Sequence, residues 1–139
     1  MMNSANSWKI LIAFGVGFVV AQVAKVIILM IAGKKPREAV KGILNSGGMP
    51  SGHAASMTAA TVVTGGVQGF DSAIFMLAVC VLAIVLYDAM NVRYATGVNA
   101  KILQKLTKEK VVISEGHTPA QIIVGVVLGV VIGVIMILA

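Results

Sequence analysis

The two histidines of this 139-residue chain stand in similar surroundings. His53 ends the stretch Pro-Ser-Gly-His, His117 lies in the stretch Glu-Gly-His-Thr-Pro, and each stretch directly precedes an apolar segment. Ser51 and Thr118 are residues that commonly cap helices, so each histidine is expected at a helix N-terminus. Such ends carry unpaired backbone N–H groups and a partial positive charge, which makes them anion-binding sites. Turn formation explains the serine, threonine, proline and glycine residues here, but it does not explain the histidines.

A third polar cluster, at residues 87–94, contains Asp88 and Arg93. Asp88 still lies within an apolar run, where an ionised carboxylate costs about 2.5–3.5 kcal/mol unless it is paired. Arg93 is near enough in sequence to be its partner. A plain ion pair is one interpretation, and a role in chemistry is the other, because ionisable residues inside membrane segments are functional by default. We therefore include both residues among the candidate site residues.

Lys25 raises the same question within the first apolar segment. It lies eight residues before Gly33, or about 12 Å along a helix, so its side chain could extend to the lipid headgroups. Gln22 stands three residues earlier and shares its helix face, which favours a polar stripe that faces inward. The two interpretations of Lys25 are headgroup contact and a place in the site.

Two histidines, an arginine and a lysine near helix N-termini suit phosphoryl transfer. The cations and helix dipoles can neutralise phosphate oxygens, while one histidine attacks phosphorus and the other protonates the leaving oxygen. A metal site is the competing use of histidine, but His53 and His117 supply only two ligands, with Asp88 or Glu115 as uncertain third members. We therefore predict that the site uses no metal and no other cofactor.

The composition places these residues in a membrane protein. Hydrophobic residues make up 58% of the chain and charged residues only 12%, about half the charged share of a water-soluble domain. Four apolar segments can be distinguished, at residues 10–32, 54–67, 72–90 and 119–139. Because open strands leave backbone groups unpaired in lipid, each segment is expected to be a helix. The sequence thus predicts one all-α, membrane-embedded domain over residues 1–139, a bundle of about four transmembrane helices with a short second helix.

The basic residues predict an orientation. If all four segments cross, residues 33–53 and 91–118 lie on one side, with nine lysines and arginines, while the termini and the 68–71 turn lie on the other side with only Lys9. By the positive-inside rule, the basic loops and the candidate site are predicted to be cytoplasmic and both termini to lie across the cell membrane. The loop lysines can also attract anionic membrane lipids. No aromatic residues are interleaved with them, which argues against a nucleic-acid partner.

Two motifs resemble a known superfamily. Residues 50–53 look like the Pro-Ser-Gly-His motif of the type 2 phosphatidic acid phosphatases, which include bacterial acid phosphatases and vanadium haloperoxidases. From His117 to Gly129, the chain resembles the superfamily's final motif, His-x-Pro-x-Asp-x-x-x-Gly-x-x-x-Gly. Residues 87–93 and 115–119 further resemble a divergent branch, the acid phosphatase/vanadium-dependent haloperoxidase-related membrane proteins, and that likeness covers nearly the whole chain.

This resemblance implies a metal-independent histidine phosphatase that vanadate inhibits. It implies that His117 is the nucleophile, that His53 is the general acid, and that Ser51, the Gly52 backbone N–H and Arg93 bind phosphate oxygens. The chain departs from the superfamily at the lysine motif, for which Lys25 is a substitute chosen by position, and in having Arg93 as many as 24 residues before His117. It also departs at the carboxylate that orients the nucleophile, where it has Gln121. Asp88 or Glu115 would then supply the missing carboxylate, or turnover would be slow.

The predicted function is hydrolysis of a phosphomonoester or diphosphate on a lipid, through a phosphohistidine. The expected substrate is a phosphorylated lipid, and the candidate residues fall into two groups: catalytic His117, His53 and Asp88, and substrate-binding Lys25, Ser51, Gly52, Arg93, Glu115 and Gln121. The alternative is a non-catalytic protein that binds or translocates phospholipids or polyprenyl phosphates, which Gln121 favours, and a third interpretation is a small structural bundle or subunit. Glycines at 125, 129 and 133 offer a face for close helix packing, either within the chain or in a homo-oligomer.

Overall fold

The described part of the protein is built from helices alone. The computed structural model describes residues 4–41, 48–109, 111, 113 and 116–139. In chain order its elements are α1 (Ser4–Ile31), α2 (Pro36–Lys41), α3 (Gly52–Gln68), α4 (Ala73–Tyr87), the π-helix η1 (Asp88–Val92), α5 (Arg93–Thr107) and α6 (Pro119–Leu138). Three helical stretches are long and apolar enough to cross a membrane: Ser7–Ile31, Ala73–Thr107 and Pro119–Leu138. The prediction of an all-α membrane bundle of about four helices is confirmed.

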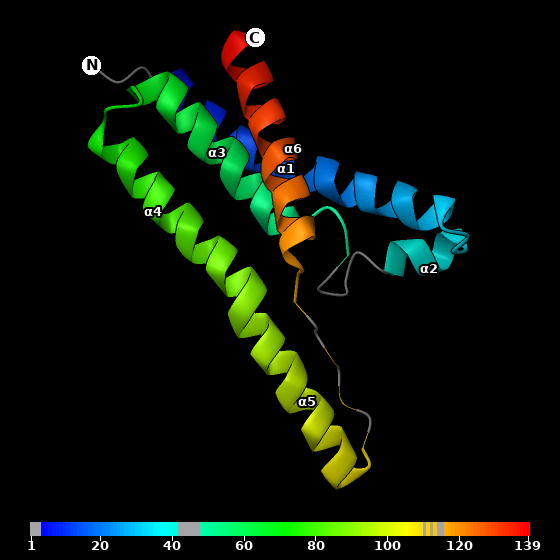
Figure 1. Cartoon of the computed structure of the whole chain (residues 1–139). Helices are drawn as coiled ribbons and strands as arrows, with labels where there is room; N and C mark the ends of the chain where they lie inside the picture. Colours follow the sequence, from blue (N-terminus) through cyan, green and yellow to red (C-terminus); the bar gives the residue numbers. More distant parts are fainter. Residues whose placement is uncertain (1–3, 42–47, 110, 112, 114–115) are drawn as a thin grey trace.

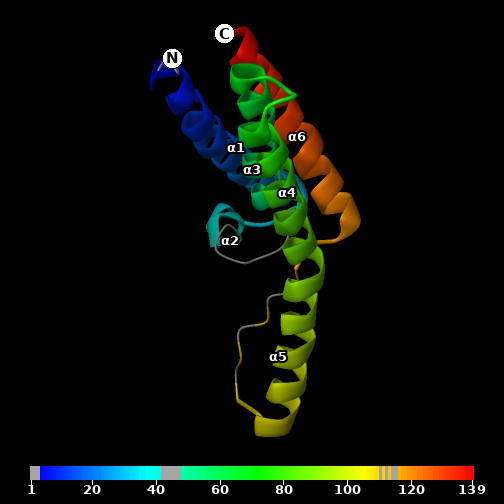
Figure 2. The same ribbon diagram turned by 90° about the vertical axis from the view of Figure 1, so that its left-hand side faces the viewer.

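Helix α3 lies in the middle of this bundle and contacts α1, α4 and α6 (Figures 1 and 2). The start of α1, the end of α6 and the turn between α3 and α4 lie at one end of the bundle. The end of α1, the starts of α3 and α6, and η1 lie toward the other end.

Close packing around α3 depends on small residues. Along α6, a Cβ added to Gly125, Gly129 or Gly133 would lie 2.5–2.8 Å from atoms of α3 or of Ser51 before it, closer than real Cβ atoms come to a neighbour. Along α1, Gly17 would meet the Ala55 carbonyl oxygen at 2.9 Å in the same way. Because these glycines let backbones approach closely, the glycine face of α6 packs within the chain, which decides between the two uses that the sequence left open.

The short second apolar segment is packed inside the bundle. Helix α3 has 17 residues, which gives about 25 Å at 1.5 Å per residue, less than the roughly 30 Å of a hydrocarbon core. Ten of its residues are buried, among them Ser56, Thr58, Thr61 and Thr64. Thr61 and Thr64 donate hydrogen bonds from their hydroxyl groups to backbone oxygens four residues earlier, at 2.8 Å each. Neighbouring helices therefore shield the polar groups of α3.

The expectation of a loop over residues 91–118 is wrong for much of its length. The helix that begins at Ala73 continues through η1 and α5 to Thr107. Helix α5 is amphipathic, with Val98, Ile102 and Leu106 at intervals of four residues. Because polar residues separate them, α5 forms no uninterrupted apolar run by which the sequence would mark it as part of the helix. The basic segment after residue 33 likewise contains a short helix, α2.

A pair of glycine-to-alanine substitutions tests the packing of α6 on α3. Gly129→Ala places a Cβ 2.5 Å from a backbone oxygen, so the helices must separate, and we expect the free energy of unfolding to fall by about 1–3 kcal/mol. Gly15→Ala in α1 meets nothing within 4 Å, so its greater helix propensity should stabilise the protein by about 0.5–1 kcal/mol. Thermal unfolding in detergent, followed by circular dichroism, measures both. Equal changes in melting temperature would contradict the packing described.

Candidate active site

A hydrogen bond from the His117 backbone positions the start of α6. In η1, the Arg93 N–H donates to the oxygen of Asp88, five residues earlier, rather than to Ala89 O as in an α-helix. Ala89 O instead accepts a hydrogen bond from the His117 N–H, at 3.0 Å. Gly116 has a φ of +72°, and a Cβ there would lie 3.0 Å from Tyr94 N and 3.2 Å from Ala89 O, so only glycine fits. The π-helix thus brings His117 beside the helix that carries Asp88 and Arg93.

The side chain of His117 is buried and contacts Gln121. Its Nδ1 lies 3.2 Å from Gln121 Oε1, and the same oxygen accepts a hydrogen bond from the Thr118 N–H at 3.1 Å. A backbone N–H only donates, so the amide atom facing it must be the oxygen, and His117 Nδ1 must therefore carry the hydrogen that it shares with this oxygen. In neutral His117 the lone pair is consequently on Nε2.

Gln121 combines two tasks at the start of α6. Its backbone N–H donates to Thr118 Oγ1 at 3.4 Å, while its side chain accepts from the Thr118 N–H, which completes a capping box. The same side chain orients His117. Gln121 was predicted to bind substrate, but in this structure it contacts the candidate nucleophile, at the place where the superfamily's carboxylate is expected. The orienting group is therefore a neutral amide.

Several groups affect the charge of His117. Burial lowers the pKa of His117 below its ordinary value of 6.5, the hydrogen bond to Gln121 raises it, and the positive charges of Lys25, His53 and Arg93 lower it further. The net effect is a lowered pKa, so the imidazole stays neutral to a lower pH than a free histidine does. The same interactions show that Lys25, His53 and Arg93 lie within electrostatic range of His117, although they come from three other elements.

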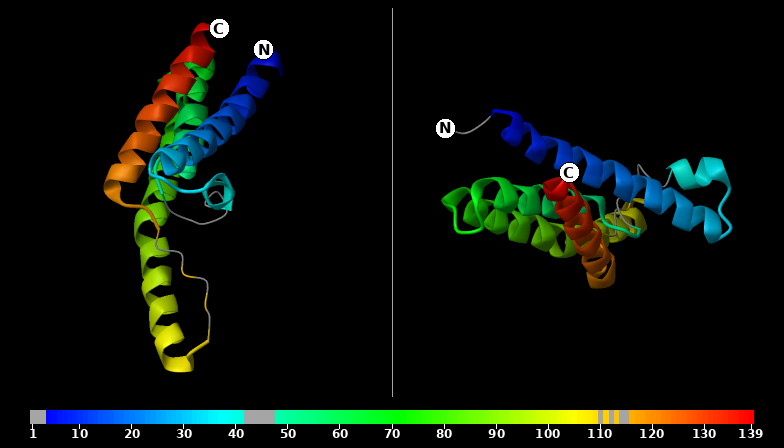
Figure 3. Two further views of the ribbon diagram at one scale, coloured as in Figure 1. Left: turned by 90° about the vertical axis from the view of Figure 1, so that its right-hand side faces the viewer. Right: turned by 90° about the horizontal axis from the view of Figure 1, so that it is seen from above.

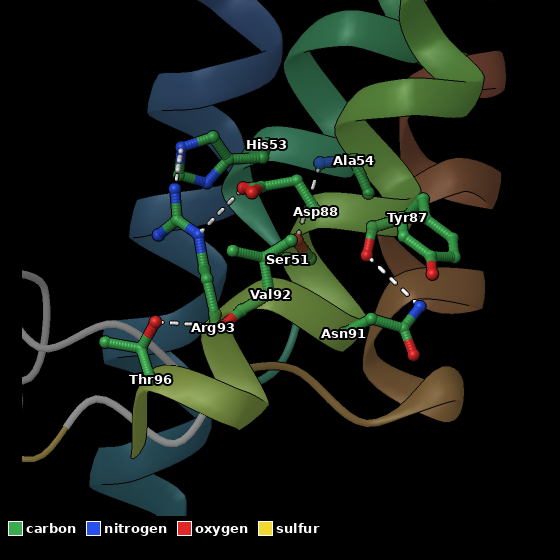
Figure 4. A network of polar contacts seen from close by, with 9 residues as sticks. All are labelled: Ser51, His53, Ala54, Tyr87, Asp88, Asn91, Val92, Arg93 and Thr96. Carbon is green, nitrogen blue, oxygen red and sulfur yellow. Dashed lines mark hydrogen bonds and ion pairs between the residues drawn. The ribbon is translucent and has the colours of Figure 1, made fainter. Parts of the chain in front are cut away.

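Arg93 joins the second histidine to Asp88 (Figure 4). Its Nη2 lies 3.3 Å from His53 Nε2, and its Nε donates to Asp88 Oδ2 at 3.4 Å. Because a guanidinium group only donates, His53 Nε2 acts as the acceptor in this state. The Arg93 and Asp88 side chains are 31% and 47% exposed, so the pair is open to solvent or ligand. The predicted pairing of Asp88 with Arg93 is present, but Asp88 does not orient His117.

Lys25 points inward against the turn that carries His53. Only 4% of Lys25 is exposed, and a Cβ on Gly48 would lie 3.6 Å from its Cδ and Cε atoms. A Cβ on Gly52 would lie 3.3 Å from Gln22 Nε2 and 3.5 Å from the ring of Phe18. The turn therefore rests on one face of α1. Within the described residues no hydrogen bond or ion pair of Lys25 is present, so its ammonium group is available to bind an anion.

Ser51 has a structural role in this state. It is fully buried, its Oγ accepts a hydrogen bond from the Ala54 N–H at 3.4 Å, and its own N–H donates to Gln121 O at 3.2 Å. It thus caps α3 and attaches that cap to α6. Gly52 is the first residue of α3. Phosphate binding by Ser51 and Gly52 stays a prediction, and Glu115 lies outside the described residues.

Two groups near the site were not among the predicted site residues. Gln22 Oε1 is buried without a hydrogen-bond partner in the described structure, beside the turn of Gly52. Its spacing of three residues from Lys25 was a usable signal, since both share one helix face. Ala89 contributes only a backbone oxygen, which no side-chain pattern reveals. In the described part of the chain, no group of three or more His, Cys, Asp or Glu side chains is arranged to hold a metal ion.

Comparison with known proteins agrees with the motifs. Residues 6–132 match the profile of a family described as the Divergent PAP2 family. The chain is also 35% identical, over 86 residues, to an uncharacterised membrane protein of Bacillus subtilis, YuiD. That alignment covers 62% of this chain and 53% of YuiD, so the chain spans about half the length of this relative. No solved structure matches the chain.

Substitution of Gln121 tests its contact with His117. A carboxylate in Gln121→Glu should stabilise the imidazolium ion and so raise the pKa of His117. Gln121→Ala removes a hydrogen bond that raises this pKa, so the pKa should fall. Histidine NMR titration of protein in detergent micelles measures these changes. His53, which has no bond to Gln121 in the structure, is the internal control. Identical titration of His117 in all three proteins would contradict the assigned contact.

Proposed function

The chain belongs to the Divergent PAP2 family, and on this basis we propose that it is an integral membrane phosphatase that hydrolyses a lipid-linked phosphomonoester or diphosphate. The observation that carries the proposal is the state of His117. Its Nδ1 is bonded to Gln121, its Nε2 has the lone pair, and its surroundings are cationic. This is the arrangement that a nucleophile toward phosphorus requires.

In the proposed first step, His117 Nε2 attacks phosphorus. A P–N bond forms while the bond from phosphorus to the lipid oxygen breaks, and the leaving oxygen takes a proton from His53. Water then attacks the phosphohistidine, gives a proton back to His53 and releases inorganic phosphate, so that both histidines return to their starting states.

Two cations assist in this reaction. Arg93 and Lys25 neutralise the charge on the phosphate oxygens, which is the main contribution a protein makes to phosphoryl transfer. Arg93 bonds to His53 Nε2 in the absence of substrate. When the Arg93 guanidinium turns to a phosphate, it releases His53 Nε2. That nitrogen can then take up the proton that His53 donates as the general acid. Asp88 holds the Nε side of Arg93 and thereby limits where the guanidinium can point.

The position of the site favours a lipid substrate. Arg93, His53 and His117 lie at the end of the bundle where α3 and α6 begin, which is where headgroups would lie. Helix α4, directly before this site, has no buried residue, so lipid chains can lie along it up to Tyr87. A phosphate attached to a lipid can thus reach the site without leaving the membrane.

Binding without turnover is the second candidate function, and Gln121 favours it. A neutral amide stabilises the imidazolium less than a carboxylate does. In serine hydrolases, loss of the aspartate that orients the histidine lowers the rate of catalysis for a related reason. A protein of this kind would bind or translocate phosphorylated lipids through the same cations. It would release no phosphate and form no phosphohistidine.

Replacement of His117 separates these two functions. Purified protein in detergent should release inorganic phosphate from a diacylglycerol or polyprenyl phosphate, and vanadate should inhibit it. His117→Ala should abolish release, because no other group could attack in its place, whereas Asn91→Ala, an exposed neighbour of Arg93, should retain it. Acid-labile labelling of the protein by phosphorus-32 lipid should also require His117. Release that persists in His117→Ala would refute the mechanism, and binding without release or labelling would establish the second function.

We also propose that the site faces the cytoplasm, from the charge asymmetry. Single cysteines at Thr107 and Asp71, placed in a Cys80→Ser background, mark the two ends of the bundle. In intact cells a membrane-impermeant maleimide should label the cysteine at position 71 and not that at position 107, while permeabilised cells should show both labelled. The reverse pattern would place the site outside.

A further inference from the structure

Helix α5 has an uncovered apolar face. Val98, Ile102 and Leu106 recur every four residues on this face and are 38%, 51% and 76% exposed. Gly97 and Ala100, on another side of the helix, are buried. In a helix that packs by its apolar side, the large apolar side chains are buried, whereas in α5 they are exposed. We therefore expect a partner outside the described chain to cover Val98, Ile102 and Leu106.

The length of the helix places this face beyond the hydrocarbon core. From Ala73 to Thr107 the helix has 35 residues, or about 52 Å, whereas a bilayer core is about 30 Å thick. The difference is about the length of α5, which extends away from the other helices (Figures 1 and 3). Tyr87 and Tyr94, both exposed, flank η1, and tyrosines are enriched where a membrane helix leaves the core. A straight helix would thus place the apolar face of α5 in water.

The charges of α5 indicate what covers this face. The helix has Lys101 and Lys105, is followed by Lys108, and contains no acidic residue. A second copy packed alongside in parallel would bring like charges together, which is unfavourable. An anionic lipid surface instead attracts each of them, and lysines beside an apolar helix face are typical of helices that lie in the membrane interface. The bilayer is also within immediate reach, because α5 directly continues a membrane helix.

We propose that α5 is a membrane-surface helix, which lays Val98, Ile102 and Leu106 into the headgroup region of an anionic bilayer by bending at η1. The π-helix is a natural place for this bend, because helices kink where the regular hydrogen-bond ladder is interrupted. Bending there brings the lysines of α5 next to the lipid headgroups around Arg93. This proposal depends on the geometry and charge of α5 and not on catalysis.

Site-specific tryptophan fluorescence of the full chain in nanodiscs tests this proposal. Trp8, the only tryptophan, is replaced by phenylalanine, and tryptophan is placed at Ile102 or, as the control, at Thr107, an exposed residue about 140° around the helix from Ile102. In an equal mixture of phosphatidylglycerol and phosphatidylcholine, brominated lipid should quench Ile102→Trp at least about twofold more than Thr107→Trp. Aqueous acrylamide should show the opposite order. Leu106→Trp serves as a second probe if Ile102→Trp does not fold.

The dependence on charge separates lipid binding from other occupants. Quenching of Ile102→Trp by brominated lipid should fall in pure phosphatidylcholine, in high salt and in the double variant Lys105→Glu, Lys108→Glu. A probe at position 102 that acrylamide quenches freely and brominated lipid does not would show that α5 extends into water. A probe protected from both quenchers would show that a protein surface, such as a second copy, covers it. Either result would overturn the proposal.

Discussion

The hydrogen bond from the His117 N–H to Ala89 O joins two parts of the chain on which the candidate site depends. One part begins α6 and carries a buried imidazole; the other is the π-helix that carries Asp88 and leads to Arg93. The bond exists because the π-helix changes the pairing within the helix, so that Arg93 N–H bonds to Asp88 O and not to Ala89 O. It also requires Gly116, whose positive φ and lack of a Cβ allow the two backbones to meet. π-Helices are commonly found at functional sites, and this one has an identifiable structural effect.

The close packing of α3 brings the remaining groups together. Glycines on α6 and Gly17 on α1 allow both helices to approach the backbone of α3, so that Lys25, His53 and His117 gather at one end of the bundle. The cations at this end are Lys25 and Arg93, and placing them near each other without a phosphate has a cost, because like charges repel and the Lys25 side chain is largely removed from water. An anion that binds among them offsets that cost. This electrostatic argument supports phosphate recognition whether or not turnover follows.

The neutral orienting group distinguishes this site from a site with a carboxylate. Gln121 fixes the tautomer of His117 as firmly as a carboxylate could, because the Thr118 N–H determines which amide atom faces the ring. It adds no negative charge, however, so a positively charged His117 ring would be less stabilised here than beside a carboxylate. Geometry and charge, which a carboxylate supplies together, are therefore separated in this protein. The result is a histidine that is well oriented and has a low pKa.

What the sequence by itself determined was local. The apolar runs required membrane helices, Ser51 and Thr118 marked two helix starts, each histidine was placed at one of them, and Asp88 was paired with Arg93 five residues later. The family followed from short motifs. These features depend on neighbours within one or two helical turns, which a pattern of residue types records.

Only the tertiary structure decided that Lys25 points inward, that the glycines of α6 pack against α3, that Gln121 and not Asp88 orients His117, and that the helix continues beyond Met90 through a π-helix. Each of these depends on the approach of backbones from distant parts of the chain, and a backbone oxygen such as Ala89 O has no residue type by which a sequence could reveal it.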